Sequence, residues 1–190
     1  MSKVFVAKWH HLILYPDWLR RLHQRPRKFL SALVKPGMTA ADIGCGLGFY
    51  TVEMARMVGE KGRVVSVDFQ PEMLGFTERK VKKARVSERV EIVKCSQDDI
   101  TVTGRFDFVL SMWVSHEVED QERFFRQILG ILKPGGKFLL AEPKFHVGEG
   151  LFTTICDDAK GVGMRKILKP WVGGSRAALF TSLSEQEIKG

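Results

Sequence analysis

Apolar segments of strand length alternate with helical patterns along most of this 190-residue chain. The run of Val64, Val65 and Val67 is typical of a buried strand, whereas Phe124 and Ile128 recur at the spacing of one helix face. From about residue 38 the order is strand, helix, strand, helix, strand, followed by strand, helix and strand. Alternation of this kind predicts βαβ units and a mostly parallel sheet.

The boundaries of the predicted elements follow from these patterns and from helix-breaking residues. Pro71 suits the first turn of a helix, and the run Lys133-Pro134-Gly135-Gly136 ends another helix and turns the chain. Predicted strands span 39–43, 63–67, 90–94, 106–111 and 137–141, with helices over 50–58, 71–84 and 121–132. We further predict a helix over 152–160, strands over 164–170 and 176–181, and a helical segment over 16–34 that Pro26 interrupts.

Length and composition indicate one globular domain. The chain has 190 residues, of which 44% are hydrophobic and 27% charged. No apolar run reaches the roughly 18 to 20 residues that cross a bilayer. The apolar residues between Lys3 and Lys8 are too few for a secretory signal. We therefore expect no membrane span and a cytoplasmic location.

The three cysteines, Cys45, Cys95 and Cys156, are widely spaced and form no C-x-x-C pair. An odd count with this spacing argues against a disulfide framework and against a zinc site. We expect these side chains to act as small buried hydrophobic groups, and we expect no metal site.

The net charge of +8 is concentrated at the two ends of the chain. Residues 1–35 carry a net charge of +7 and residues 160–190 carry +4, whereas the segment between them carries −3. Basic ends can attract an anionic substrate, a nucleic acid or a membrane surface, and they can also be an ordinary solvated surface.

Three glycines stand where the first strand ends and the next helix begins. Gly44, Gly46 and Gly48 would let the backbone turn sharply and approach a ligand at the expected crevice of an open α/β sheet. The dinucleotide pattern G-x-G-x-x-G needs its third glycine one residue later, and Phe49 is bulky where that pattern packs closely. The spacing therefore weighs against NAD or FAD.

An acidic residue follows the second predicted strand. Asp68 lies 20 residues after Gly48, and an acid in this place can accept hydrogen bonds from the two ribose hydroxyls of a nucleoside. Dinucleotide folds and S-adenosylmethionine folds share this spacing, so Asp68 indicates nucleoside binding without choosing the nucleoside.

Four motifs in order carry a family resemblance. They are Asp42-Ile43-Gly44-Cys45-Gly46-Leu47-Gly48, Val65-Ser66-Val67-Asp68, Phe106-Asp107-Phe108-Val109-Leu110-Ser111 and Leu132-Lys133-Pro134-Gly135-Gly136. Over about residues 36–182 the chain resembles class I S-adenosylmethionine-dependent methyltransferases. In detail it resembles the branch near the ubiquinone and menaquinone biosynthesis methyltransferases.

The resemblance implies a fold and a division of the chain. The fold is a Rossmann-like α/β domain with a mostly parallel seven-stranded sheet, helices on both faces and an antiparallel strand 7. Residues 36–190 would form the S-adenosylmethionine-binding domain, and residues 1–35 a helical extension or lid.

The resemblance also implies which residues meet the cofactor. The glycine loop would pass under its methionine part, Asp68 would hold the ribose, and Phe69 and Met73 would line the adenine pocket. Ser96 stands where the family often has Asp, so Asp98, or Ser96 with the backbone of Gln97, would contact the adenine edge. The implied cofactor-binding residues are Asp42, Gly44, Cys45, Gly46, Gly48, Tyr50, Thr51, Asp68, Phe69, Met73, Ser96, Gln97, Asp98, Ser111 and Met112.

His116 is the candidate for acid–base chemistry. The family has a His at this place, near the substrate side, where it could act as a base or orient a nucleophile. A structural hydrogen bond is the alternative role. The sequence around it contains no nucleophilic Ser or Cys triad, and methyl transfer from a sulfonium needs none, because alignment and exclusion of water are the main requirements.

These features predict a methyltransferase that uses S-adenosylmethionine, releases S-adenosylhomocysteine and acts on a small-molecule acceptor. The alternatives are an RNA or protein methyltransferase that uses the basic N-terminal segment, and a non-catalytic S-adenosylmethionine-binding protein. The stretch Ser111-Met112-Trp113-Val114 lacks the Asn/Asp-Pro-Pro-aromatic motif of amine methylation on bases, although other RNA methylations do not need it. The sequence leaves the oligomeric state open.

The N-terminal segment yields a first testable prediction. Residues 9–25 and 142–147 are rich in aromatic and histidine side chains, and in the family these segments cover the acceptor site. We predict that residues 9–25 form a lid, so that deletion of residues 1–25 abolishes turnover and spares cofactor binding. Loss of cofactor binding in a truncated chain that still folds would contradict the lid.

Overall fold

A seven-stranded sheet forms the centre of the protein in the computed structural model, which describes residues 17–182. The strand order is β3-β2-β1-β4-β5-β7-β6, and β7 runs antiparallel to its neighbours β5 and β6 whereas the other pairs are parallel. The strands are β1 (Thr39–Ile43), β2 (Arg63–Asp68), β3 (Val90–Lys94), β4 (Phe106–Met112), β5 (Leu132–Pro143), β6 (Arg165–Leu168) and β7 (Ser175–Thr181). This arrangement confirms the predicted Rossmann-like sheet and its antiparallel strand 7.

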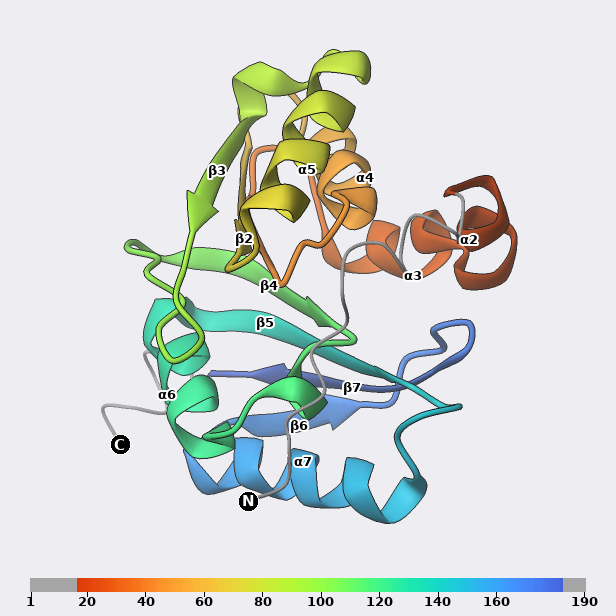
Figure 1. The fold of residues 1–190 in the computed structure, drawn as a ribbon. Coiled ribbons are helices and arrows are strands. Elements are labelled where there is room, and N and C mark those ends of the chain that lie inside the picture. Colours follow the sequence, from red (N-terminus) through yellow and green to blue (C-terminus); the bar gives the residue numbers. More distant parts are fainter. Residues whose placement is uncertain (1–16, 183–190) are drawn as a thin grey trace.

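Helices cover both faces of the sheet (Figure 1). One apolar core joins α3, α4 and α5 to one face, and a second core joins α6 and α7 to the other. The helices are α2 (Asp17–Gln24), α3 (Pro26–Leu33), α4 (Phe49–Val58), α5 (Pro71–Lys83), α6 (Gln121–Ile131) and α7 (Glu149–Gly161), with short 3₁₀ turns η1 (Ser87–Arg89) and η2 (Ser115–Glu117). The two cores explain why the central strands read as nearly continuous apolar runs.

The predicted boundaries agree with the structure to within a few residues, and the differences have local causes. Helix α4 begins at Phe49 because Gly48 caps it in a left-handed conformation. Helix α6 begins after Asp120, whose carboxylate accepts a hydrogen bond from the Arg123 backbone N–H at 2.8 Å. Helix α7 starts three residues before the predicted position, at Glu149.

The run from Lys133 to Gly136, which we predicted as a turn, belongs to β5. It lies in an irregular part of the pairing with β4, between the Phe106–Leu132 and Phe108–Lys137 pairs. Gly136 has no room for a side chain there, because a Cβ atom would lie 2.8 Å from the Lys133 carbonyl oxygen and 2.9 Å from that of Phe106. The glycine thus permits a close backbone approach inside the strand, which is a common role of glycine in strands.

The predicted helical segment over 16–34 consists of two helices, α2 and α3, with Arg25 between them in a left-handed conformation at φ 43°. Residues 1–16, which include residues 9–16 of the predicted lid, lie outside the described residues. Within residues 17–182, no helix has both the length and the apolar character needed to cross a membrane.

The N-terminal helices are held on the domain by the carboxylate of Glu53. This side chain on α4 is fully buried and forms ion pairs with Arg21 of α2 at 2.7 Å, Arg27 of α3 at 3.1 Å and Arg56 at 3.2 Å. A buried carboxylate keeps its charge only when it is paired and hydrogen-bonded, so the three arginines and Glu53 depend on one another.

Two further contacts fix α2 over the carboxyl ends of the strands. The Tyr50 hydroxyl donates a hydrogen bond to Gln24 Oε1 at 2.5 Å. In the loop before β7, a Cβ atom on Gly173 would lie 1.9 Å from the His23 carbonyl oxygen. Only glycine allows this loop and the end of α2 to pack so closely.

Substitution of Glu53 tests this anchoring. We expect Glu53→Gln to lower the free energy of unfolding by about 2 kcal/mol, because the buried site loses the charge that pairs three arginines. Glu91→Gln is the matched control: its partner Arg63 lies 3.5 Å away and both side chains are about half exposed, so the loss should stay below about 0.5 kcal/mol. Urea denaturation measures both variants, and equal losses would contradict the proposed anchoring role.

Candidate cofactor and acceptor site

The glycine loop crosses the carboxyl end of β2. The backbone N–H groups of Gly44 and Cys45 both donate to the Val67 carbonyl oxygen, at 2.8 and 2.9 Å. Gly44, Gly46 and Gly48 have φ values of 70°, 52° and 72°, which side chains rarely tolerate. A Cβ atom on Gly44 would also lie 2.3 Å from Val114 Cγ2, so the loop packs directly against the turn that follows β4.

Asp68 connects the end of β2 to the glycine loop. Its Oδ2 accepts a hydrogen bond from the Gly46 backbone N–H at 2.9 Å, and its Oδ1 accepts one from the Gln70 N–H at 3.0 Å. Burial raises the pKa of this carboxyl, and the backbone hydrogen bonds oppose that rise. Each oxygen keeps a further lone pair, so the carboxylate can still accept hydrogen bonds from two hydroxyl groups.

Asp42 and Thr51 lie deeper, in a buried polar cluster below the loop. The Thr51 hydroxyl lies 2.6 Å from Asp42 Oδ2, to which it donates, and 2.6 Å from Ser66 Oγ. Burial raises the pKa of Asp42 to about 6, opposed by the hydrogen bond from Thr51. The cluster ties β1, β2 and α4 together beneath the loop, and direct contact of these two residues with a cofactor stays a prediction.

The other predicted cofactor residues near the loop differ in exposure. Cys45 is buried with its Sγ 3.7 Å from Thr77 Oγ1, and burial raises the pKa of its thiol, so it is a poor nucleophile. Tyr50 and Met73 are buried, whereas Phe69, directly after Asp68, is half-buried. Met112 ends β4 in a buried position.

Ser111 is the other predicted residue on β4, and it is fully buried. Its hydroxyl oxygen has no hydrogen-bond partner among the described residues. Buried hydroxyl groups are nearly always hydrogen-bonded, so this orphaned group at the end of β4 indicates a place where a ligand or water completes the bonding.

The segment after β3 lies beside Asp68 and is exposed. The Cys95 backbone N–H donates to the Asp68 carbonyl oxygen at 3.1 Å, which places the start of this segment next to the loop. Ser96, Gln97 and Asp98 are exposed, and Ser96 Oγ accepts a hydrogen bond from the Asp99 N–H at 3.1 Å. Their predicted contacts with an adenine ring stay a prediction.

His116 stands in η2, immediately after β4, and is paired with a buried acid that sequence reasoning did not identify. Its Nδ1 lies 2.5 Å from Glu142 Oε2, and the other oxygen of Glu142 accepts hydrogen bonds from the N–H and hydroxyl of Ser115 at 2.9 and 2.5 Å. Glu142 is fully buried at the end of β5. The sequence did contain a signal for Glu142, because it is an acidic residue at the end of a predicted strand, as Asp68 is.

The electrostatics around His116 favour its charged form. Burial lowers the pKa of the imidazole, but the hydrogen bond and charge of Glu142, together with the charge of Glu117, outweigh burial and raise it above 6.5. Nε2 lies 3.9 Å from Glu117 Oε1, which is too long for a hydrogen bond. The ring of His146, from the β5–α7 connection, lies 5.1 Å from that of His116.

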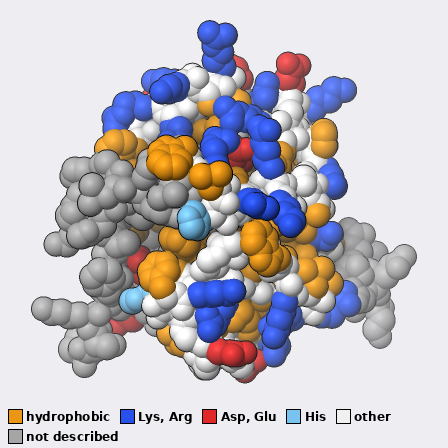
Figure 2. All heavy atoms as spheres, turned by 90° about the vertical axis from the view of Figure 1, so that its right-hand side faces the viewer, with side chains coloured by type: hydrophobic (Ala, Val, Ile, Leu, Met, Phe, Trp, Pro, Cys, Tyr) orange, Lys and Arg blue, Asp and Glu red, His pale blue; other side chains and the backbone are white. Residues whose placement is uncertain are grey.

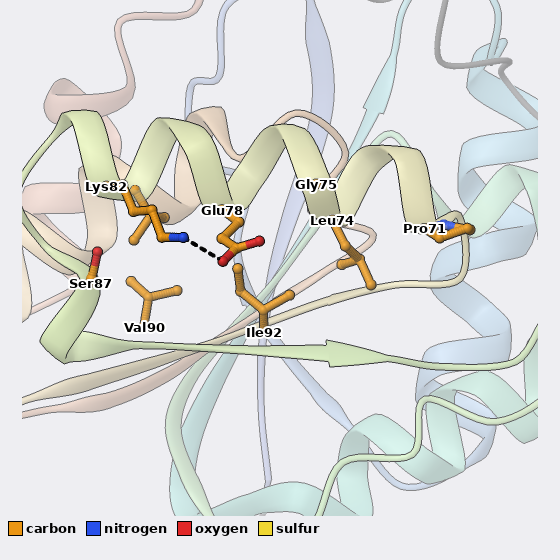
Figure 3. A pocket seen from close by; sticks show the side chains of 9 residues that line it. Pro71, Leu74, Gly75, Glu78, Lys82, Ser87, Val90 and Ile92 are labelled. Atoms are coloured by element: carbon orange, nitrogen blue, oxygen red, sulfur yellow. Dashed lines mark hydrogen bonds and ion pairs between the residues drawn. The ribbon is translucent and has the colours of Figure 1, made fainter.

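A separate groove of about 480 Å³ runs along the edge of the sheet between α5 and β3, and the Glu78–Lys82 ion pair at 2.8 Å lies along its α5 side (Figure 3). None of the predicted site residues lines it. Its lining residues are Pro71, Leu74, Gly75, Glu78, Val81, Lys82, Ser87, Val90 and Ile92. The groove is open to solvent. We place the candidate site at the carboxyl ends of β2, β4 and β5 instead, because Asp68, Glu142 and the unpartnered Ser111 hydroxyl lie there.

The face that carries α2 and the connection from β6 to β7 mixes Lys, Arg and hydrophobic side chains (Figure 2). Trp18 and Leu22 of α2, Phe145 of the β5–α7 connection and Trp171 before β7 are more than half exposed. The Lys28 ammonium lies 5.1 Å from the centre of the Trp171 ring. The basic character predicted for the N-terminal end therefore coincides with exposed aromatic surface.

Comparison with known proteins gives the family. Residues 34–182 match the family model of a methyltransferase domain, and the chain belongs to that family. The fold and the family together define the class as S-adenosylmethionine-dependent methyltransferases, which confirms the resemblance and S-adenosylmethionine as the cofactor.

Individual relatives agree with this class. The chain is 32% identical over 110 residues to a demethylmenaquinone methyltransferase of Bacillus cereus (strain ATCC 10987 / NRS 248), which is 57% of this chain and 46% of that protein. It is 30% identical over 109 residues to the ubiquinone/menaquinone biosynthesis C-methyltransferase UbiE of Vibrio cholerae, covering 57% and 42%. The chain thus spans less than half the length of these relatives. A methyltransferase structure from Aquifex aeolicus superposes with a TM-score of 0.83 at 24% identity, covering 94% of this chain and all of that one.

The His116–Glu142 pair makes a prediction about pH. Because folding raises the pKa of His116 above 6.5, the stability contributed by the pair is present below pH about 6.5 and is lost as the pH rises through the folded pKa. We expect Glu142→Gln to move the His116 titration to lower pH. A histidine NMR titration measures the shift, with Glu149→Gln on α7 as the control, and an unchanged His116 pKa in Glu142→Gln would contradict the assignment.

Proposed function

We propose that the chain transfers a methyl group to a small-molecule acceptor whose nucleophile must lose a proton, and that His116 receives this proton. The observation that carries the proposal is the buried His116–Glu142 pair beside the glycine loop, with Nδ1 and Oε2 2.5 Å apart. Methyl transfer by itself needs alignment alone, so a paired imidazole at this place supports an acceptor that also needs a base.

The residues at the strand ends suit the cofactor. Asp68 offers further lone pairs beside a loop that has glycine at positions 44, 46 and 48, and the Ser111 hydroxyl is buried without a partner among residues 17–182. When bound, S-adenosylmethionine supplies a methyl group that its positively charged sulfur activates for displacement. Asp68 would hold the ribose hydroxyls, and the loop with the end of β4 would hold the amino-acid part.

Glu142 would set the tautomer of His116. In neutral His116 the proton stays on Nδ1, where it is donated to Glu142, so that Nε2 carries the lone pair that accepts a proton from the acceptor. Ser115 holds the other oxygen of Glu142 through its N–H and hydroxyl, which keeps the carboxylate from rotating. The base is therefore oriented by two residues, Glu142 at the end of β5 and Ser115 after the end of β4.

The surroundings of His116 support an aromatic acceptor of the quinone type. The Trp113 and Phe145 rings meet edge to face at 5.7 Å, and His146 packs on His116 at 5.1 Å. Aromatic side chains favour flat apolar ligands. The two relatives above are named for demethylmenaquinone methylation and for ubiquinone/menaquinone biosynthesis. The reduced, hydroquinone form of a quinone carries aromatic hydroxyl groups whose deprotonation a base assists.

RNA is the second candidate acceptor, and it is supported by the Lys and Arg side chains on the face that carries α2 and the connection from β6 to β7 (Figure 2). Retention on RNA that weakens steeply with salt, together with methyl transfer to RNA, would replace the small-molecule proposal. Methyl transfer to hydroquinones without transfer to RNA supports it.

Cofactor binding gives the next prediction. Wild type should bind S-adenosylhomocysteine with a Kd near 1 μM, about −8 kcal/mol, and Asp68→Ala should weaken binding by about 10 to 100-fold, because two charge-assisted hydrogen bonds are lost. Asp157→Ala, which removes an exposed acid paired with Lys160 on α7, is the control and should bind as wild type does. Isothermal titration measures all three, and absence of binding to folded wild type would overturn the proposed function.

Turnover tests the base. With a hydroquinone acceptor and S-adenosylmethionine, the rate should rise with pH through the pKa of His116, because only the neutral imidazole accepts a proton. His116→Gln should lower kcat by about 100 to 10,000-fold and remove this pH dependence, with cofactor affinity retained. A His116→Gln enzyme with wild-type kcat would show that His116 has a structural role alone.

A further inference from the structure

Arg20 of α2 is a buried cation among aromatic rings. The residue is 8% exposed, and its guanidinium carbon lies 4.9 Å from the centre of the Phe49 ring and 5.8 Å from the centres of the Tyr50 and Trp113 rings. Phe49 and Tyr50 open helix α4, and Trp113 follows β4. The guanidinium thus lies where the glycine loop ends, between α4 and the end of β4.

No acid among residues 18–182 forms an ion pair with Arg20, and the Arg20 Nε has no hydrogen-bond partner among the described side chains. The neighbouring Arg21, in contrast, pairs with Glu53 at 2.7 Å. The charge of Arg20 lowers the pKa of Asp42, but Asp42 already accepts a hydrogen bond from Thr51 at 2.6 Å in its own buried cluster. A buried cation without a paired anion is costly, so the site is suited to an anion that is not part of the described chain.

The first turn of α4 independently favours an anion. Its cap is Gly48, which provides no side-chain hydrogen bond, and the turn contains no acidic residue. The first N–H groups of a helix have no partner within the helix, and the helix dipole adds positive potential there. The Arg20 guanidinium packs on the ring of Phe49, the first residue of this helix, and this contact places its charge beside the first turn of α4.

From this placement we infer that Arg20 and the N-terminus of α4 bind the α-carboxylate of an amino acid, the one at the amino-acid end of S-adenosylmethionine and S-adenosylhomocysteine. The inference rests on the proposed cofactor binding and adds a residue that lies before the matched methyltransferase domain. A guanidinium can hold a carboxylate through two parallel hydrogen bonds, and the rings of Phe49, Tyr50 and Trp113 keep it in position. Helix α2 is then part of the cofactor site.

A pair of ligands that differ in the carboxylate tests the inference. S-adenosylhomocysteine carries the α-amino acid, and 5′-methylthioadenosine has the same adenosine and thioether without it. We expect Arg20→Gln to raise the Kd of S-adenosylhomocysteine about 10 to 100-fold and to change that of 5′-methylthioadenosine less than about twofold. Arg20→Lys, which keeps the charge and loses the paired geometry, should lie between wild type and Arg20→Gln.

Arg126→Gln is the control, because it removes an exposed arginine of α6 that pairs with Glu122 at 2.6 Å, and it should leave the affinity ratio of the two ligands unchanged. If Arg20→Gln weakens both ligands equally, or neither, Arg20 is a packing residue and the inference fails while the proposed function stands. If wild type binds neither ligand, the proposed function fails as well. If Arg20→Gln does not fold, the affinities of wild type and Arg20→Lys for S-adenosylmethionine and for its decarboxylated form answer the same question. The inference requires that Arg20→Lys weakens S-adenosylmethionine more than the decarboxylated form.

The inference also separates two roles of the N-terminal segment. A segment that is a lid alone leaves cofactor affinity unchanged when residues 1–25 are deleted. The deletion also removes Arg20, so the inference replaces the expectation that it spares cofactor binding. The affinity for S-adenosylhomocysteine should fall by the factor seen in Arg20→Gln, whereas the affinity for 5′-methylthioadenosine should stay unchanged. Equal affinity of the truncated and full chains for S-adenosylhomocysteine would overturn the carboxylate subsite.

Discussion

The Val67 carbonyl oxygen accepts hydrogen bonds from two successive N–H groups, those of Gly44 and Cys45, and this contact draws the glycine loop across the end of β2. Asp68, the next residue, then holds the loop from the other side through the Gly46 N–H. Everything else at the site is placed relative to this loop. Val114 fills the space that a side chain at Gly44 would occupy, which brings the turn with Ser115 and His116 against it.

The two buried acids at strand ends, Asp68 and Glu142, have different hydrogen-bond partners. Asp68 accepts hydrogen bonds from backbone N–H groups, and its carboxylate oxygens keep further acceptor capacity. Glu142 is occupied by Ser115 and His116, so its effect reaches a ligand through the imidazole. In both places hydrogen bonds hold a carboxylate rigid at the carboxyl edge of the sheet, where open α/β sheets bind their ligands.

The N-terminal helices add a third charged element to this edge. Glu53 collects Arg21, Arg27 and Arg56, and this pairing holds α2 close enough for Arg20 to lie over the rings of α4. The two neighbouring arginines of α2 therefore differ in their partners. Arg21 forms an ion pair with the Glu53 carboxylate, whereas Arg20 forms no ion pair with the described residues. Anchoring of the helix and binding of an anion are therefore coupled through the packing of α2 on α4.

The sequence by itself determined the alternation of strands and helices, the glycine loop and Asp68, because these depend on local periodicity and on glycines that adopt positive φ values. The tertiary structure decided the partners of side chains that are distant along the chain. Glu142 pairs with His116 across 26 residues, and Arg27 reaches Glu53 across the same separation. Such pairs depend on which strand ends lie side by side and on how α2 and α3 pack on α4, and no local pattern carries that information.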